Sequence, residues 1–331
     1  MRSGGARTLN ARNLQAGASA ELAGRMEELR LAHGLLCPDP ECSASQWDID
    51  IPVHVARLNH RLAELESVRN GALLARVSVV EASGPAVGLA ADETSGRLFV
   101  LDALGAVHVH DAAGQVLEDV NVEFARSRGV FVGPDGALGV YDARRVCMDG
   151  AVVEPVLPDG GPGIVGAVAD ERDIWLLVRD GAAKTRLFRL RRAIRGASGL
   201  AAFPLQVNPC CLFRACGHVH VGDRLGHVLQ LDRHGTRPVL VNQTVSSPMR
   251  CGCGVAGGFV AASSHRLCLA GKGQLLASWD LRRETGIPAF APSGMAVLAA
   301  PGESRDRGVM LAVLDASRDE RSRLFFFRLQ Y

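Results

Sequence analysis

Residues 96–114 read GRLFVLDALGAVHVHDAAG, and residues 217–235 read GHVHVGDRLGHVLQLDRHG. The two stretches lie 121 residues apart and align without a gap, with eight identical residues in nineteen positions. The identities are glycine, aspartate, leucine and valine, at the turn-forming and core positions of two short apolar runs. Self-similarity of this kind at a fixed distance indicates a repeated structural unit.

Weaker copies of the unit occupy the chain between and after these two stretches. The tetrapeptide Val100–Ala103 recurs unchanged at Val313–Ala316, and similar tetrapeptides begin at Val140 and Val178. A degraded copy lies at 261–264. The aspartate-like positions are therefore 102, 142, 180, 223, about 264 and 315, which gives a mean step of about 43 residues.

A β unit of 40–45 residues that recurs six times predicts an all-β fold, the six-bladed β-propeller, although the spacing is also compatible with seven blades. Each unit would be a four-stranded sheet with two apolar faces, which neighbouring blades must cover. The recurring aspartate suits a tight turn after the second strand, because its side chain can accept hydrogen bonds from backbone N–H groups two residues on.

The end of the chain indicates how the ring closes. The last unit shows three strands, GMAVLAA, GVMLAVLDA and RLFFFRLQ, before the sequence given ends at Tyr331. A further strand, ALLARVSVVEA, precedes the first unit at 72–82. We expect this strand to complete the last blade, so that the two ends of the propeller region join.

The units resemble NHL-type and WD-type propeller repeats. Residues 88–117, GLAADETSGRLFVLDALGAVHVHDAAGQVL, are similar to an NHL blade in particular. The Trp-Asp signature of WD repeats is present only as Trp279-Asp280. The resemblance covers 72–331 and implies membership of the β-propeller superfamily without indicating one family within it.

The chain before Gly71 has a different character. We expect a disordered tail at 1–18, whose arginines and missing acids also fit a mitochondrial presequence, and a helical pair at 19–71 that precedes the propeller at 72–331. The second helix carries an amphipathic stripe with coiled-coil spacing, which would pack on the propeller or on a partner protein. The stripe consists of Ile51, Val55, Leu58, Leu62 and Leu65.

The composition limits the classes of partner and the cellular compartments that we expect for the protein. The 331 residues are 47% hydrophobic and 22% charged, with a net charge of +2, so no global field attracts nucleic acid or a membrane. No apolar run reaches the length of a membrane span. The nine cysteines lack the spacing of a secreted disulfide framework, which predicts an intracellular protein of the cytoplasm or nucleus, or of mitochondria if the tail is a presequence.

Two kinds of side chain are candidate metal ligands. His108 and His110 form one His-x-His pair and His218 and His220 another, but the repeat alignment places the pairs on different strands, so they are not one repeated site. The second group is a set of thiols predicted on the innermost strands of adjacent blades. These are Cys210, Cys211, Cys251 and Cys253. Their spacing matches no closed zinc motif, so we expect buried structural thiols and neither metal nor cofactor.

The segment RLFRLRRAIR is the one local basic patch that the sequence reveals. Its arginines could contact RNA or an acidic partner, but few aromatic residues accompany them, which favours a solvated strand edge. The arginines are Arg186, Arg189, Arg191, Arg192 and Arg195.

Three functional hypotheses follow. The favoured one is a non-enzymatic protein–protein interaction scaffold, a subunit of a hetero-complex that docks through the propeller and the N-terminal helices. A propeller enzyme of the lactonase type would need carboxylates on the inner strands to hold a channel metal, and the predicted inner strands VGLAAD, GVFVG, GIVGAVAD, NPCCLF and CGCGVAG are poor in acids. An RNA-binding propeller that uses the patch at 186–195 is the third.

Overall fold

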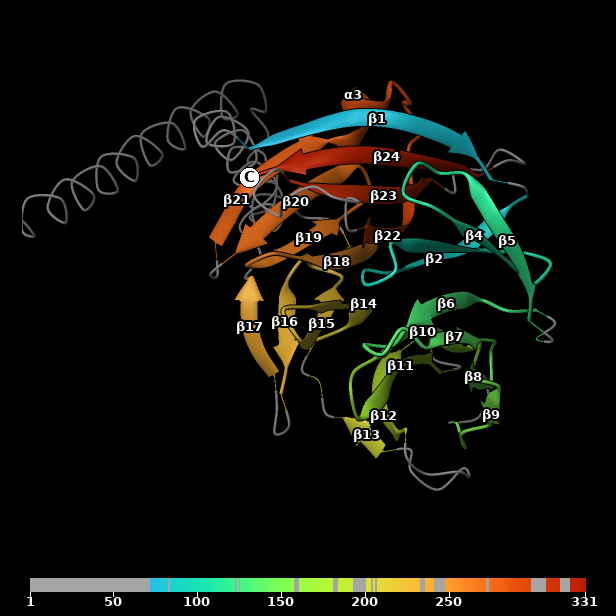
Figure 1. Ribbon diagram of the computed structural model, residues 1–331. Coiled ribbons are helices and arrows are strands. Elements are labelled where there is room, and N and C mark those ends of the chain that lie inside the picture. Colours follow the sequence, from blue (N-terminus) through green and yellow to red (C-terminus); the bar gives the residue numbers. More distant parts are fainter. Residues whose placement is uncertain are drawn as a thin grey trace, which may run out of the picture. The chain divides into compact units, whose positions relative to one another are not determined.

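Six four-stranded antiparallel sheets are arranged as blades around a central channel (Figure 1). The computed structural model describes residues 72–331 except 83, 123, 125, 158–160, 181–183, 193–200, 204, 206, 233–235, 241–247, 272–273, 299–307 and 316–321. The side chains of 237–240 and 274 also lie outside this description. The described part of the chain is an all-β six-bladed propeller, as the repeat predicts. The expected tail at 1–18 and the expected helical pair at 19–71 lie outside the described residues.

The blades follow one another along the chain. Blade 1 contains β2 (Ala86–Asp92), β3 (Arg97–Asp102), β4 (Ala106–His110) and β5 (Val116–Asn121). Blade 2 contains β6 (Gly129–Val132), β7 (Leu138–Tyr141), β8 (Val146–Met148) and β9 (Ala151–Val153). Blade 3 contains β10 (Gly163–Ala169), β11 (Asp173–Arg179), β12 (Thr185–Arg191) and β13 (Ala201–Phe203).

Blade 4 contains β14 (Pro209–Ala215), β15 (His218–Asp223), β16 (Val228–Leu231) and β17 (Thr236–Leu240). Blade 5 contains β18 (Cys251–Val255), β19 (Gly258–Ala262), β20 (Arg266–Gly271) and β21 (Gln274–Asp280). Blade 6 combines β22 (Pro292–Leu298), β23 (Val309–Asp315) and β24 (Arg323–Gln330) with β1 (Leu73–Glu81). In each blade the first strand of the meander lines the channel.

Strand β1 closes the ring by pairing antiparallel with β24, from Leu73 opposite Gln330 to Glu81 opposite Arg323, with a register shift between Arg76 and Ser78 (Figure 1). A second link follows at once, because the Ser322 side chain accepts a hydrogen bond from the Ala86 N–H at 2.8 Å. The last blade is therefore built from both ends of the propeller region, as the missing fourth strand predicts.

Aspartates hold the turns between second and third strands. The Asp102 carboxylate accepts hydrogen bonds from the Leu104 and Ala106 N–H groups at 2.9 and 2.8 Å. Asp223 binds the N–H groups two and four residues on in the same way, at 2.8 and 2.7 Å. We call the end of the ring that carries these turns, after residues 102, 142, 180, 223, 263 and 315, the Asp-turn face. The other end, with the turns at 93–96, 133–137, 170–172, 216–217 and 256–257, is the opposite face.

Blade 5 differs from the other blades in two details. The residue at the aspartate position is Ser263, directly after β19 and within the degraded copy at 261–264. Asp280 of the Trp-Asp pair caps α3 (Leu281–Thr285), a short helix between blades 5 and 6, by accepting a hydrogen bond from the Arg282 N–H at 3.0 Å. Its neighbour Trp279 is buried in the hydrophobic cluster shared by blades 5 and 6.

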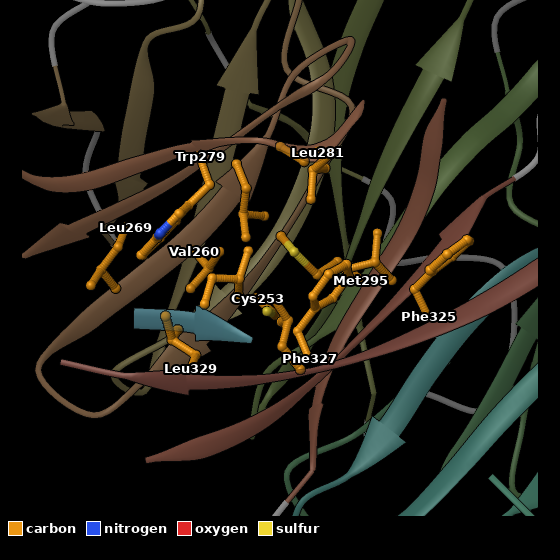
Figure 2. Packing of buried hydrophobic residues seen from close by; sticks show 14 of the residues in the cluster. Cys253, Val260, Leu269, Trp279, Leu281, Met295, Phe325, Phe327 and Leu329 are labelled. Atoms are coloured by element: carbon orange, nitrogen blue, oxygen red, sulfur yellow. The ribbon is translucent and has the colours of Figure 1, made fainter. Parts of the chain in front are cut away.

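The core lies between blades. Figure 2 shows the cluster shared by blades 5 and 6, where Val260 and Trp279 of one sheet meet Met295 and Phe327 of the next. Full burial of a side chain of this size stabilises the fold by about 1.5–3 kcal/mol. Since each sheet is covered on both faces, second strands such as β3 are buried almost throughout, whereas the outer strand β5 has no buried residue.

Candidate functional site

The channel is narrow and lined mainly by small and aliphatic residues. It holds a cavity of about 230 Å³ lined by the six first strands, β2, β6, β10, β14, β18 and β22. Glycine is needed where neighbouring first strands approach closely: a Cβ at Gly294 would lie 2.8 Å from the Leu89 Cβ, and one at Gly252 would lie 2.6 Å from a ring carbon of Phe213. The channel is therefore a packed axis with a small void.

Four first strands carry one extra residue near the Asp-turn face. The register against the second strand shifts around each of these residues. They are Val87, Val165, Cys210 and Ser293, and all four line the channel cavity. A β-bulge of this kind re-aims a side chain, so the same local irregularity is used in four blades to present a residue to the channel.

The candidate thiols lie where the sequence predicts, on the first strands of adjacent blades. Cys210 and Cys211 belong to β14, and Cys251 and Cys253 belong to β18. Cys210 is half-buried, while the other three are buried. Burial raises the pKa of Cys211 and Cys253 well above the usual thiol value and that of Cys251 to about 12.

In the absence of a metal ion, such thiols stay protonated at neutral pH. In the described part of the chain, no three or more His, Cys, Asp or Glu side chains are grouped so as to hold a metal ion. The arrangement suits cysteines that act as small core residues.

The two His-x-His pairs lie on different strands, as the repeat alignment predicts. His108 and His110 belong to the third strand of blade 1, and His218 and His220 belong to the second strand of blade 4. His220 stacks on Phe213 with ring centroids 5.3 Å apart, and burial lowers its pKa to about 4. His220 is thus a neutral core residue at physiological pH.

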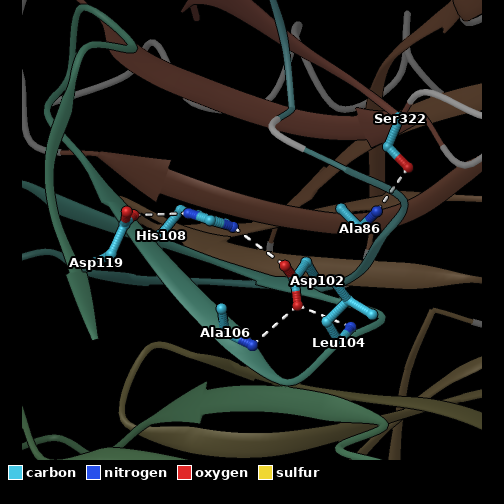
Figure 3. A network of polar contacts seen from close by, with 7 residues as sticks. All are labelled: Ala86, Asp102, Leu104, Ala106, His108, Asp119 and Ser322. Atoms are coloured by element: carbon cyan, nitrogen blue, oxygen red, sulfur yellow. Dashed lines mark hydrogen bonds and ion pairs between the residues drawn. The ribbon is translucent and has the colours of Figure 1, made fainter. Parts of the chain in front are cut away.

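His108 bridges two carboxylates (Figure 3). Its Nδ1 lies 2.7 Å from Asp119 on β5, and its Nε2 lies 3.3 Å from Asp102 in the turn. Burial works against the charged imidazole, but the hydrogen bonds to Asp119 and Asp102 outweigh burial and raise the pKa of His108. The residue that the sequence offers as a metal ligand therefore ties the outer strand of blade 1 to the turn.

The predicted arginine patch lies on β12 and just beyond it. Arg186 lies 3.3 Å from Asp180, and Arg189 lies 3.9 Å from Asp173. Arg191 is exposed. Arg195 lies outside the described residues. Carboxylates thus face two of these arginines and reduce the net charge of the patch.

Arg192 has a structural contact between blades. Its guanidinium lies 2.7 Å from the Asp135 carboxylate of blade 2 and donates a further hydrogen bond to the Asp170 carbonyl at 3.2 Å. The hydrogen bond from Arg192 is the main reason that the pKa of Asp135 is lowered. Arg192 therefore links two blades across the opposite face.

A second group of arginines surrounds the channel mouth on the Asp-turn face. Arg128 and Arg250 directly precede the first strands of blades 2 and 5, and their N–H groups donate to Tyr141 and Ala262 at the ends of the neighbouring second strands. Arg250 also lines the channel cavity. These hydrogen bonds fix both arginines at this end of the ring.

Blades 3 and 4 each add one arginine to the same mouth. Arg179 ends β11 opposite Gly163, the first residue of β10, and Arg224 follows Asp223 and donates its N–H to the Asn208 carbonyl at 3.1 Å. Arg128, Arg179, Arg224 and Arg250 are all exposed. We refer to these four residues as the mouth arginines.

The mouth arginines and the turn aspartates differ in exposure. The aspartates are buried in their turns, with exposed fractions of 7% for Asp102, 8% for Asp142, 9% for Asp180, 2% for Asp223 and 1% for Asp315. On the same face, the aliphatic side chains of Leu104, Val156 and Leu225 are 86%, 80% and 62% exposed. This end of the ring therefore presents guanidinium and aliphatic groups to solvent while its turn carboxylates are withdrawn.

The opposite face is different. A cavity of about 580 Å³ lies there, and its lining includes Glu93, Asp170, Glu171 and Arg214. A neighbouring cavity of about 300 Å³ shares the turn at 170–172. The lining of the larger cavity thus carries three carboxylates and one guanidinium.

Sequence reasoning misses the mouth arginines, because it considers only local patches such as 186–195. The four residues are 122 positions apart at their extremes and form no run. A usable signal exists in the repeat itself, since Arg179 and Arg224 flank recurring aspartates. Superposing all six units would place these arginines at one end.

No protein-family model and no curated protein matches the sequence. In the described part of the chain, no helix is both long and apolar enough to cross a membrane. Among solved structures, the chain is similar to the β-propeller domain of Cps50 (Swd1) from Myceliophteria thermophila, with a TM-score of 0.48 and 10% identity over 76% of this chain and 99% of that one. The likeness is one of fold.

Proposed function

We propose that the protein is a non-enzymatic interaction module, a subunit that binds other proteins within a larger assembly. The observation that carries this proposal is the make-up of the Asp-turn face, where exposed Leu104, Val156 and Leu225 accompany the exposed mouth arginines. Protein interfaces usually combine apolar groups with a polar rim. Arginine is likewise enriched at such interfaces.

The N-terminal region would supply a second contact. The stripe formed by Ile51, Val55, Leu58, Leu62 and Leu65 lies outside the described residues, so its role remains a prediction from its spacing. We expect the protein to act inside the cell, in the cytoplasm or nucleus, or in mitochondria if residues 1–18 form a presequence. Fractionation of cells that produce the full chain with a C-terminal tag distinguishes these compartments.

Purification from native cells tests the proposal. We expect the tagged full chain to elute with stoichiometric partner proteins and with a mass well above that of the 35.1 kDa monomer. Mass measurement by light scattering, before and after gentle crosslinking, identifies the assembly. Elution as a lone monomer under both conditions would overturn the proposal.

Two other functions make different predictions. A propeller enzyme with a channel metal predicts tightly bound, stoichiometric metal that is lost when Cys210 and Cys251 are replaced by alanine. An RNA-binding propeller predicts salt-sensitive binding that weakens when arginines of the β12 patch become glutamate. Arg186 and Arg191 suit that test better than Arg192, because Arg192 links blades 2 and 3.

A further inference from the structure

We infer that the mouth arginines bind the carboxylates of an acidic segment of a partner protein, and that aliphatic residues of the same segment contact Leu225 and its exposed neighbours. The inference rests on the proposed function and specifies its partner chemistry. It assigns a role to the Asp-turn end of the ring, where one arginine from each of four consecutive blades lies and where Arg250 also lines the channel cavity.

The guanidinium groups of the mouth arginines are available for a ligand. Among the described residues, none of the four forms an ion pair with a carboxylate. The carboxylate that directly precedes Arg224 is already engaged, since Asp223 accepts bonds from two backbone N–H groups and lies 2.9 Å from the ring of His227. Arg128 donates to the Pro162 carbonyl and Arg224 to the Cys210 thiol, which leaves further N–H groups on each guanidinium.

A carboxylate ligand fits this arrangement chemically. The guanidinium presents its N–H groups as a planar fork that matches a carboxylate in two parallel hydrogen bonds. Because the four arginines stand on separate blades, one side chain could not occupy them all, whereas a segment with several acidic residues could. The rigid blades fix the spacing of the four arginines before binding. Less conformational entropy is therefore lost when a partner binds.

The aliphatic groups on the same face favour a protein over a nucleic acid. Leu225 stands next to Arg224 in the same turn and is 62% exposed, and Leu104 occupies the equivalent position in blade 1. Phosphodiester backbones offer nothing to such groups, and single-stranded binding normally uses exposed aromatic rings. In the described part of the chain, Tyr331 is the one large aromatic residue that is exposed, and it bonds to the Ala256 carbonyl on the opposite face.

Carboxylates at the opposite face predict at which end of the ring an acidic segment binds. Glu93, Asp170 and Glu171 line the cavity of the opposite face. An acidic segment is repelled there and attracted at the mouth arginines, so we expect it to bind at one end of the channel only.

Fluorescence anisotropy on the full chain tests the inference. The probe is a fluorescein-labelled peptide of Glu-Glu-Leu repeats, with a Lys-Lys-Leu peptide and an oligothymidylate as comparison probes. We expect the acidic peptide alone to bind, more weakly as salt is raised. Arg224→Glu together with Arg250→Glu should lower its affinity by about tenfold for each reversed charge. Leu225→Ser should weaken the Glu-Glu-Leu peptide but leave a polyglutamate peptide unchanged.

A matched charge reversal away from the mouth provides the control. Arg97→Glu together with Arg172→Glu changes the net charge equally at exposed positions of the opposite face, and this variant should bind like the wild type. Thermal unfolding of every variant shows that the fold is kept. The inference is overturned if the mouth variant binds the acidic peptide as tightly as the control, if the wild type does not bind it, or if the oligothymidylate binds more tightly. If native partners nevertheless co-purify, the proposed function stands; if the chain purifies alone, the proposed function fails whatever the peptide does.

Discussion

Single aspartate residues stabilise the turns of this propeller, because one carboxylate can accept several hydrogen bonds. Asp223 accepts two backbone N–H groups and contacts the His227 ring at 2.9 Å. A buried N–H group left without a partner costs about 1–3 kcal/mol, which explains why aspartate recurs at this position. Blade 5 shows the contrast, because Ser263 has a buried hydroxyl without a hydrogen-bond partner and leaves the turn to backbone bonds.

His108 should make the stability of blade 1 depend on pH. Its folded pKa is raised, so its contribution is fully present below the unfolded histidine pKa of about 6.5 and is lost as pH rises through the folded value. We expect the difference in free energy of unfolding between wild type and His108→Gln to be largest in mild acid and to shrink in mild alkali. Urea unfolding across this pH range measures the difference.

His220 has the opposite effect on the pH dependence of stability. Wild type and His108→Gln must therefore be compared with each other at every pH. The pKa of His220 is lowered by burial, so protonation favours the unfolded state and removes stability as pH falls. His220 is present in both proteins, and its effect cancels in the difference. A difference between wild type and His108→Gln that is constant with pH would show that His108 does not bridge Asp102 and Asp119 as a charged group.

Among the elements, β1 has the most distant partner in sequence, since it completes a sheet whose other strands end the chain. Its two faces differ: Leu74 is 5% exposed and packs in the cluster shared by blades 5 and 6, whereas Leu73 is 52% exposed. The strand therefore closes the ring with side-chain burial as well as with backbone pairing. The exposed side of β1 contributes little to this closure.

Adjacent leucines of β1 test the closure. Leu74→Ala should lower the free energy of unfolding by about 2–5 kcal/mol, because it opens a cavity in the cluster. Leu73→Ala removes the same atoms from an exposed position and should change stability by less than about 0.5 kcal/mol. Chemical denaturation followed by circular dichroism gives both values. Equal effects of the two substitutions would show that β1 does not pack as described.

At the scale of the whole molecule, the ring is stable because no blade covers its own faces. The shared clusters between neighbouring sheets make each blade depend on two others, and β1 extends this dependence across the closure. The same arrangement gathers the mouth arginines at one end of the ring and Glu93, Asp170 and Glu171, together with Arg214, at the other. Neither property belongs to a single blade.

Thiol labelling should report this cooperativity. Cys211 lies in blade 4 and Cys251, Cys253 and Cys268 lie in blade 5, all buried and free. Because burial also raises their pKa values, we expect them to resist alkylation until the ring unfolds, and then to react together. Peptide mass spectrometry along a urea series measures each site.

Exposed Cys216 provides the internal control, since it should react without denaturant. Protection of Cys211 that is lost at a clearly lower urea concentration than that of Cys268 would mean that blades 4 and 5 unfold separately. The closed ring would then not unfold as one cooperative unit.

The sequence by itself determined the repeat, the closing strand and the structural role of the recurring aspartates, while the choice of six blades over seven came from the structure. These features depend on local spacing, turn chemistry and alternation of apolar residues, which a chain carries in linear order. It could not reveal that His108 joins Asp102 to Asp119, since that contact depends on the pairing of β4 with β5. Only the tertiary structure assembled Arg128, Arg179, Arg224 and Arg250 at one mouth, because closing six blades into a ring brings together residues that have no proximity along the chain.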